Sequence, residues 1–135
     1  MSSEVLLIVF EAEETGVPAI VVYLATKIKP MKPVFVYCTC KNAEEAIEIG
    51  QKVVEAELAA CANVLPGMRS IYKWKGELQQ DEECVLILKS HLALVEALTN
   101  MVVAAHSYET PAVVALPIVD GSPAYIEWMA GEMRV

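Results

Sequence analysis

The sequence predicts an α+β fold, in which helices cover one face of an antiparallel β-sheet. Three observations carry this prediction. The chain has 135 residues, of which 56% are hydrophobic and 21% charged, which suits one globular domain. Along the chain, segments with the alternating pattern of a β-strand are interspersed with segments that have the apolar spacing of a helix. Two strand-like segments are joined by a short Lys-Gly-Glu turn at residues 75–77, which predicts a long β-hairpin.

The first strand is predicted at residues 33–39, where alternate residues, Cys38 among them, are expected to face one side of the sheet. A helix is expected to follow this strand. Asn42 is a favourable N-cap, and Glu45, three residues later, completes a start of the capping-box type. The apolar stripe of this helix is expected to consist of Ile47, Gly50, Val54 and Leu58.

The remaining segments complete a β-α-β-β-α-β-α order. A strand at residues 59–74, which a Leu-Pro-Gly sequence interrupts as a bulge does, is followed by a return strand that reaches Ser90. A helix at about 90–106, a strand at 111–119 and a last helix with Ser122 as its N-cap follow. This order is the split βαβ, or ferredoxin-like βαββαβ, arrangement with an extra C-terminal helix. The other, apolar face of the sheet is expected to be covered by further copies of the chain.

Two domains of unequal character are expected. Residues 1–32 are interpreted as an N-terminal extension, and residues 33–135 as the ferredoxin-like domain. Pro30 and Pro33 bracket the connector between them. The apolar runs of the extension are each shorter than the stretch of about 18 residues that crosses a membrane, so no membrane association is expected.

Charge and cysteine content argue against several classes of function. The formal net charge is −8 and no basic patch is visible, so nucleic acid is not an expected partner. The four cysteines form neither a CxxC pair nor a zinc-finger spacing, and Cys61 and Cys84 are interpreted as core residues. Reduced thiols predict a cytoplasmic location. No phosphate-binding glycine loop or hydrolase motif occurs, so the protein is not expected to be an enzyme.

The residues that could carry chemistry are two thiols, an imidazole and a carboxylate. Cys38 and Cys40 are two positions apart, about 6.6 Å in an extended strand, so a bridge between them is not expected. Each is either a small buried residue or a soft metal ligand. His106, at the end of a predicted helix, is either stabilised there by the helix C-terminus or acts as a ligand. Glu109 lies close enough to His106 in the sequence to be a third ligand.

Several longer stretches carry a family resemblance: VYCTCKNAEEA, LAACANVLPGMRSIYKWKGE, ECVLILKS and HSYETPAVVALPI, with YIEWM near the end of the chain. Together they resemble the CutA family of divalent-cation tolerance proteins, over roughly residues 33–130. The resemblance implies a ferredoxin-like subunit that assembles as a compact homotrimer, similar in architecture to PII signalling proteins. It also implies a link to copper and other divalent cations.

By this resemblance, metal ligation is assigned to Cys38 and His106. The chain departs from the family pattern at three positions. Ala105 stands where some members have a second histidine, and Ser107 stands where proline is usual. A second thiol, Cys40, is present where none is expected.

The residues and the resemblance together predict a non-enzymatic homotrimer that binds copper or another divalent cation through Cys38, His106 and Glu109. Tyr72 and Trp74, near the hairpin tip, are expected to make subunit contacts, because aromatic side chains are enriched in interface cores. The alternative is a PII-like trimer that binds a small metabolite or a partner protein, with metal binding incidental.

Overall fold

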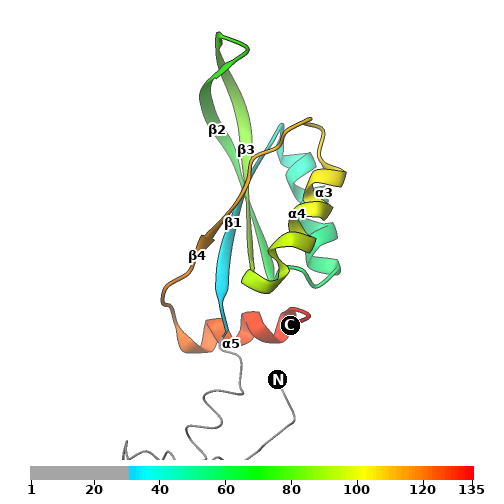
Figure 1. Ribbon diagram of the computed structural model, residues 1–135, viewed down its shortest axis with the longest axis vertical. Helices are drawn as coiled ribbons and strands as arrows, with labels where there is room; N and C mark the ends of the chain where they lie inside the picture. Colours follow the sequence, from blue (N-terminus) through cyan, green and yellow to red (C-terminus); the bar gives the residue numbers. More distant parts are fainter. Residues whose placement is uncertain (1–30) are drawn as a thin grey trace, which may run out of the picture. The chain divides into compact units, whose positions relative to one another are not determined.

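A computed structural model describes residues 31–135 of the protein (Figure 1), so that nearly all of the predicted extension lies outside the described residues. The sheet consists of β1 (Pro33–Cys40), β2 (Cys61–Trp74), β3 (Glu77–His91) and β4 (Val113–Pro117). The helices are α3 (Ala43–Glu55), α4 (Val95–Ala105) and α5 (Pro123–Glu132), and a 3₁₀ turn, Leu92–Leu94, precedes α4. None of the described helices has the length and apolar character needed to cross a membrane.

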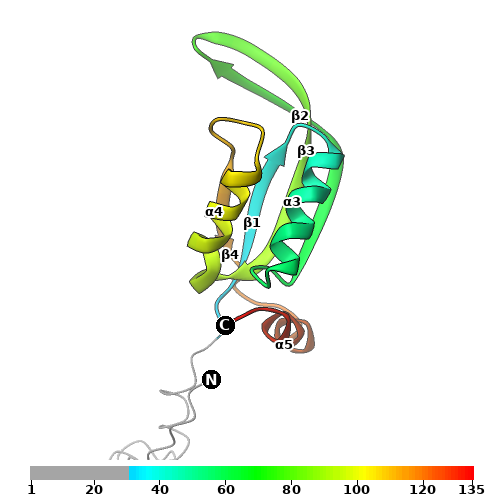
Figure 2. The same ribbon diagram turned by 90° about the vertical axis from the view of Figure 1, so that its right-hand side faces the viewer.

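The four strands lie in the order β2-β3-β1-β4, and each neighbouring pair is antiparallel. This confirms the predicted ferredoxin-like arrangement. Figure 2 looks onto α3 and α4, which lie side by side over one face of the sheet. The extra helix, α5, lies at the end of the sheet opposite to the hairpin tip (Figure 1). On the face that no helix of residues 31–135 covers, Phe35 lies beside Leu116 and Tyr37 beside Val114, across β1 and β4.

The hydrophobic core lies between the sheet and the two helices. In β1 every second residue is buried, which confirms the predicted alternation and places Cys38 and Cys40 on the helix-facing side. The buried side chains of α3 include Ala46, Ile49 and Val53. Of the predicted stripe, Gly50 and Leu58 are buried as expected, but Ile47 is 54% exposed and Val54 is only half-buried. Ala46 and Val53, each one position earlier, are buried in place of these two, because neighbouring residues of a helix point about 100° apart.

The β2–β3 hairpin contains the bulge that the Leu-Pro-Gly sequence predicts. Two residues of β2, Pro66 and Gly67, together oppose Cys84 of β3. Gly67 has a φ of +83°, which glycine adopts without a steric penalty. At the tip, Lys75 and Gly76 both have positive φ, as a two-residue type I′ turn requires.

The second helix begins later than predicted. Ser90 still belongs to β3, where it pairs with Val34, and its hydroxyl donates a buried hydrogen bond of 2.6 Å to the Leu58 carbonyl. Because the backbone of Ser90 is engaged in the sheet, the helix cannot start there. The chain first makes the 3₁₀ turn, capped by the His91 ring, which accepts from the Ala93 N–H at 2.9 Å.

Gly50 allows α3 to approach the sheet closely, and this gives a test of the packing. A Cβ at this position would lie 2.9 Å from the Cβ of Ala62, whereas a Cβ at Gly131 in α5 would meet no atom within 4 Å. Gly50→Ala should destabilise the fold by about 1–3 kcal/mol, because α3 must move away from β2. The control, Gly131→Ala, should be neutral or stabilising by up to about 1 kcal/mol, since alanine favours helix. Urea unfolding at one protomer concentration measures both, and equal stabilisation by the two variants would contradict the close approach.

Candidate functional site

Three segments of the chain meet at the end of β1, and each contributes one side chain that can bind a metal. Cys40 is the last residue of β1, Glu45 lies in the first turn of α3, and His106 is the C-cap of α4. Their Sγ, carboxylate oxygen and ring nitrogen all lie within 4.8 Å of one another. This Cys40–Glu45–His106 cluster is buried: Cys40 is 0% exposed and the side chains of His106 and Glu45 are 0% and 8% exposed.

Glu45 is placed by the start of α3. The Asn42 side chain accepts from the Glu45 N–H at 2.9 Å, which confirms the predicted cap. The Glu45 carboxylate then binds two backbone N–H groups, that of Lys41 at 3.1 Å and that of Ser107, also at 3.1 Å. Burial raises the pKa of Glu45, but the hydrogen bonds from Ser107 and Lys41 and the nearby His106 outweigh it and hold the pKa below its usual range.

The His106 ring is fixed by two backbone groups. Its Nε2 lies 2.8 Å from the Thr39 carbonyl oxygen, and its Nδ1 accepts from the Tyr108 N–H at 3.0 Å. Because a carbonyl only accepts, these partners select the neutral tautomer with the proton on Nε2. Nδ1 is then the nitrogen with a lone pair, and it lies 3.8 Å from Glu45 Oε1.

Cys40 supplies the sulfur of the cluster. Burial raises the pKa of its thiol to about 12, and the negative charge of Glu45 adds to this effect. The thiol is therefore protonated at neutral pH, and a metal ion must displace that proton to bind as it does to thiolate.

Of the three predicted ligands, the structure brings only His106 into the cluster. Cys38 is buried on the same face of β1, with its pKa also raised to about 12 by burial, but it is not a member. Glu109 lines a separate cavity. The ligand set of Cys38, His106 and Glu109 remains a prediction. Glu45 was recognised in the sequence only as a capping residue, and its spacing of three from Asn42 was the signal that placed it at a helix start.

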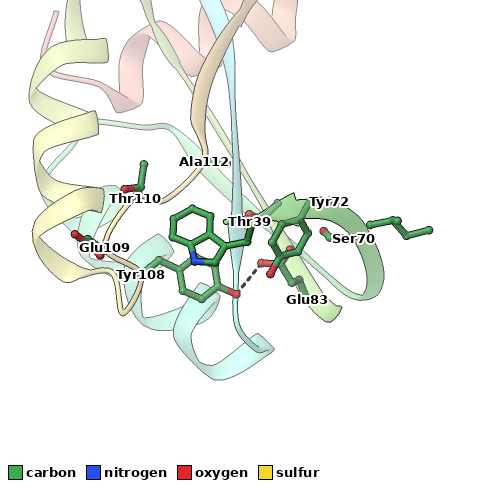
Figure 3. A pocket seen from close by; sticks show the side chains of 10 residues that line it. Thr39, Ser70, Tyr72, Glu83, Tyr108, Glu109, Thr110 and Ala112 are labelled. Atoms are coloured by element: carbon green, nitrogen blue, oxygen red, sulfur yellow. Dashed lines mark hydrogen bonds between the residues drawn. The ribbon is translucent and has the colours of Figure 1, made fainter. Parts of the chain in front are cut away.

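A cavity of about 570 Å³ lies beside the cluster, lined by residues of the hairpin, by Thr39 of β1 and by the segment that precedes β4. Figure 3 shows Tyr72, Tyr108 and Glu83 converging on it, with the Tyr108 hydroxyl donating to Glu83 at 2.7 Å. Burial, and then this hydrogen bond, raises the pKa of Tyr108. Since the Tyr108 N–H is also the donor to His106, one residue touches both the cluster and the cavity.

A family profile described as CutA1 divalent ion tolerance protein matches residues 34–132. The chain belongs to the CutA1 family. The chloroplastic CutA protein of Arabidopsis thaliana is 42% identical over 106 residues, which are 78% of this chain and 58% of that protein. CutA of Mus musculus is 44% identical over 93 residues, 69% of this chain and 52% of that protein. The chain therefore spans a little over half the length of these relatives.

Solved CutA1 structures share the fold. CutA1 from Oryza sativa has a TM-score of 0.75 and 39% identity, and the match covers 77% of this chain and 95% of that chain. CutA1 from Thermus thermophilus has a TM-score of 0.74 and 37% identity, with 76% and 99% covered. These matches confirm the CutA resemblance found in the sequence. The family is named for tolerance of divalent ions, not for an enzymatic reaction.

Proposed function

We propose that this CutA1-family protein binds copper reversibly at the Cys40–Glu45–His106 cluster, as a homotrimer and without catalytic turnover. The observation that carries the proposal is the cluster itself, in which three buried donors from separate segments lie within 4.8 Å of one another. Copper is favoured over the other divalent first-row ions by the general affinity order, and thiolate with imidazole favours the cuprous ion. Three protein donors leave a further position of a tetrahedral site open.

An ion that binds here has to replace existing bonds. His106 Nδ1 must give up the Tyr108 N–H, and Cys40 must give up its proton. Each replacement costs free energy, so binding is weaker than at a preformed site and is reversible. The thiol must also be reduced. All four cysteines are free in the structure, and this supports a reducing, cytoplasmic setting as part of the proposal.

The ligand set implied by family resemblance is the competing version of this proposal. It uses Cys38 in place of Cys40, and Glu109 in place of Glu45. In the structure Glu109 lines the neighbouring cavity and Cys38 is not a member of the cluster, so such a site requires these side chains to rearrange. Substitution of one thiol at a time separates the two versions.

Competition for cuprous ion under argon, against a chromogenic chelator, tests the ligands. Cys40→Ser and His106→Ala should each weaken binding by more than about tenfold, because each removes a direct ligand. Cys38→Ser is the matched control, since it changes an equally buried thiol of the same strand, and it should bind as the wild type does. The reverse pattern, weaker binding by Cys38→Ser and unchanged binding by Cys40→Ser, would contradict the cluster as the site and support the ligand set implied by the family resemblance.

The homotrimer is supported by apolar surface that no described segment covers. On the hairpin, Ile71, Trp74 and Leu78 are 68%, 50% and 71% exposed. On the face without helices, Val114 and Leu116 are 53% and 48% exposed. Groups of exposed apolar side chains often mark interaction surfaces, so contact with further copies is the expected use.

Light scattering tests the assembly and should give about three times the 14.8 kDa of the chain, the closed ring implied by the family resemblance. Trp74→Ala should weaken assembly by roughly 2 kcal/mol per site, because buried tryptophans are frequent interface hot spots. Trp128→Ala is the control, since Trp128 is similarly exposed, at 45%, but lies on α5. A folded monomer at micromolar concentration would contradict the proposal.

A second candidate function rests on the cavity. Its volume of about 570 Å³ and its aromatic lining of Tyr72, Trp74 and Tyr108 suit a small organic ligand. This observation favours the PII-like alternative, a trimer that binds a metabolite or a partner protein. A thermal-shift screen of small metabolites, run beside the copper titration, decides between the two functions: stabilisation by a metabolite with no specific copper binding supports the alternative.

A further inference from the structure

Two of the four cysteines face each other across neighbouring strands. In the β1–β3 register, Cys40 lies directly opposite Cys84. The other two have no such partner: Cys38 lies opposite Leu86, and Cys61 opposite Lys89. Residues directly opposite in an antiparallel pair project from the same face of the sheet, and Cys40 and Cys84 are 0% and 1% exposed. The register therefore pairs two thiols inside the core, beside the Cys40–Glu45–His106 cluster.

The spacing of such a pair is compatible with a disulfide. Directly opposed residues have Cα atoms about 4.5–5.5 Å apart, within the range of about 4.4–6.8 Å that disulfides span. Their Cβ atoms are about 4.5–5.5 Å apart, whereas a disulfide brings them to about 3.5–4.5 Å, so the strands must approach by up to about 1 Å. The Cys84 thiol makes a weak contact of 3.7 Å to the Val85 carbonyl and a hydrogen bond to the backbone of Leu65, and a side-chain rotation toward Cys40 has to break both.

The bulge in β2 provides freedom for this movement. Pro66 and Gly67 together oppose Cys84, so the β2–β3 ladder is interrupted at the residue that has to shift toward β1. A continuous ladder on both sides of β3 would resist a displacement there. At Cys84 the resistance is reduced on the β2 side alone, which favours approach to Cys40.

We propose that the Cys40–Cys84 pair reduces cupric ion to cuprous ion, an inference that rests on the proposed copper binding. Two cupric ions each take one electron, the S–H bonds of Cys40 and Cys84 break, one S–S bond forms between them, and two protons leave to solvent. The first cupric ion reaches the thiol of Cys40 by binding at the cluster, where thiolate and imidazole stabilise the cuprous product.

The reaction limits itself, because Cys40 has two roles. Once its sulfur is bonded to Cys84, it no longer acts as a thiolate ligand, so the cluster loses its soft donor and releases the ion as cuprous. The strain in the cross-strand bond makes the disulfide easy to reduce, so a dithiol reductant restores the ligand. The pair thus acts stoichiometrically, once for each cycle of thiol reduction.

The test adds cupric ion to reduced protein under argon and measures cuprous ion with a chromogenic chelator. The wild type should yield about two cuprous ions per chain, because forming one disulfide releases two electrons. Cys84→Ser and Cys40→Ser should yield half of this or less, whereas Cys61→Ser, which alters a half-buried thiol opposite Lys89, should match the wild type. Peptide mass mapping, with fragmentation between Cys38 and Cys40, should find the Cys40–Cys84 bond, and dithiothreitol should remove it.

Failure of this inference is distinguishable from failure of the proposed function. Wild-type protein that binds cuprous ion but yields no Cys40–Cys84 bond with cupric ion overturns the redox step and leaves the binding site standing. Protein that binds neither ion overturns both. The disulfide map is made on wild-type protein, so the inference is tested even if a serine variant fails to fold. A bond found instead at Cys61 or between chains would also overturn it.

Discussion

The rest of the site depends on the two hydrogen bonds that the Glu45 carboxylate accepts. One oxygen accepts from the backbone N–H of Lys41, directly after β1. The other accepts from the backbone N–H of Ser107, which lies 62 residues after Glu45 in the chain. Glu45 itself is fixed in the first turn of α3 by the Asn42 cap. A single side chain therefore joins three segments, and the cluster of Cys40 with His106 exists because these segments are held together.

This arrangement connects the candidate metal site with the cavity beside it. His106 Nδ1 accepts from the Tyr108 N–H, and the Tyr108 hydroxyl donates to Glu83 on β3, at the cavity lined by the hairpin. An ion at His106 Nδ1 removes the first of these contacts. The candidate metal site and the candidate ligand cavity are thus neighbours through one residue, so a change in either has a short physical route to the other. A coupling of this kind needs only the hydrogen bonds that the structure contains.

Local patterns predicted much of the fold. The alternation of β1, the Asn42–Glu45 cap and the Leu-Pro-Gly bulge depend on neighbouring residues, and each could be predicted from the sequence. The cluster could not. Cys38 and Cys40 have the same parity in β1, so alternation places both on one face and cannot tell which one reaches His106. The second partner of Glu45 is distant in sequence, and the pairing of Cys40 with Cys84 depends on strand register, which no local pattern determines.

The free energy of unfolding of the wild type, Glu45→Gln and Glu48→Gln, measured from about pH 7 to pH 3 at one protomer concentration, tests the central role of Glu45 most directly. Glu48, on the same helix, is 69% exposed and serves as the control. Because the folded pKa of Glu45 lies below its unfolded value of about 4.3, its contribution is complete above that value and is lost as the pH falls through the folded pKa. We predict that Glu45→Gln is less stable by about 1–3 kcal/mol at neutral pH and that the difference shrinks on acidification, while Glu48→Gln follows the wild type. Equal effects of the two variants, or a difference that does not change with pH, would contradict the account.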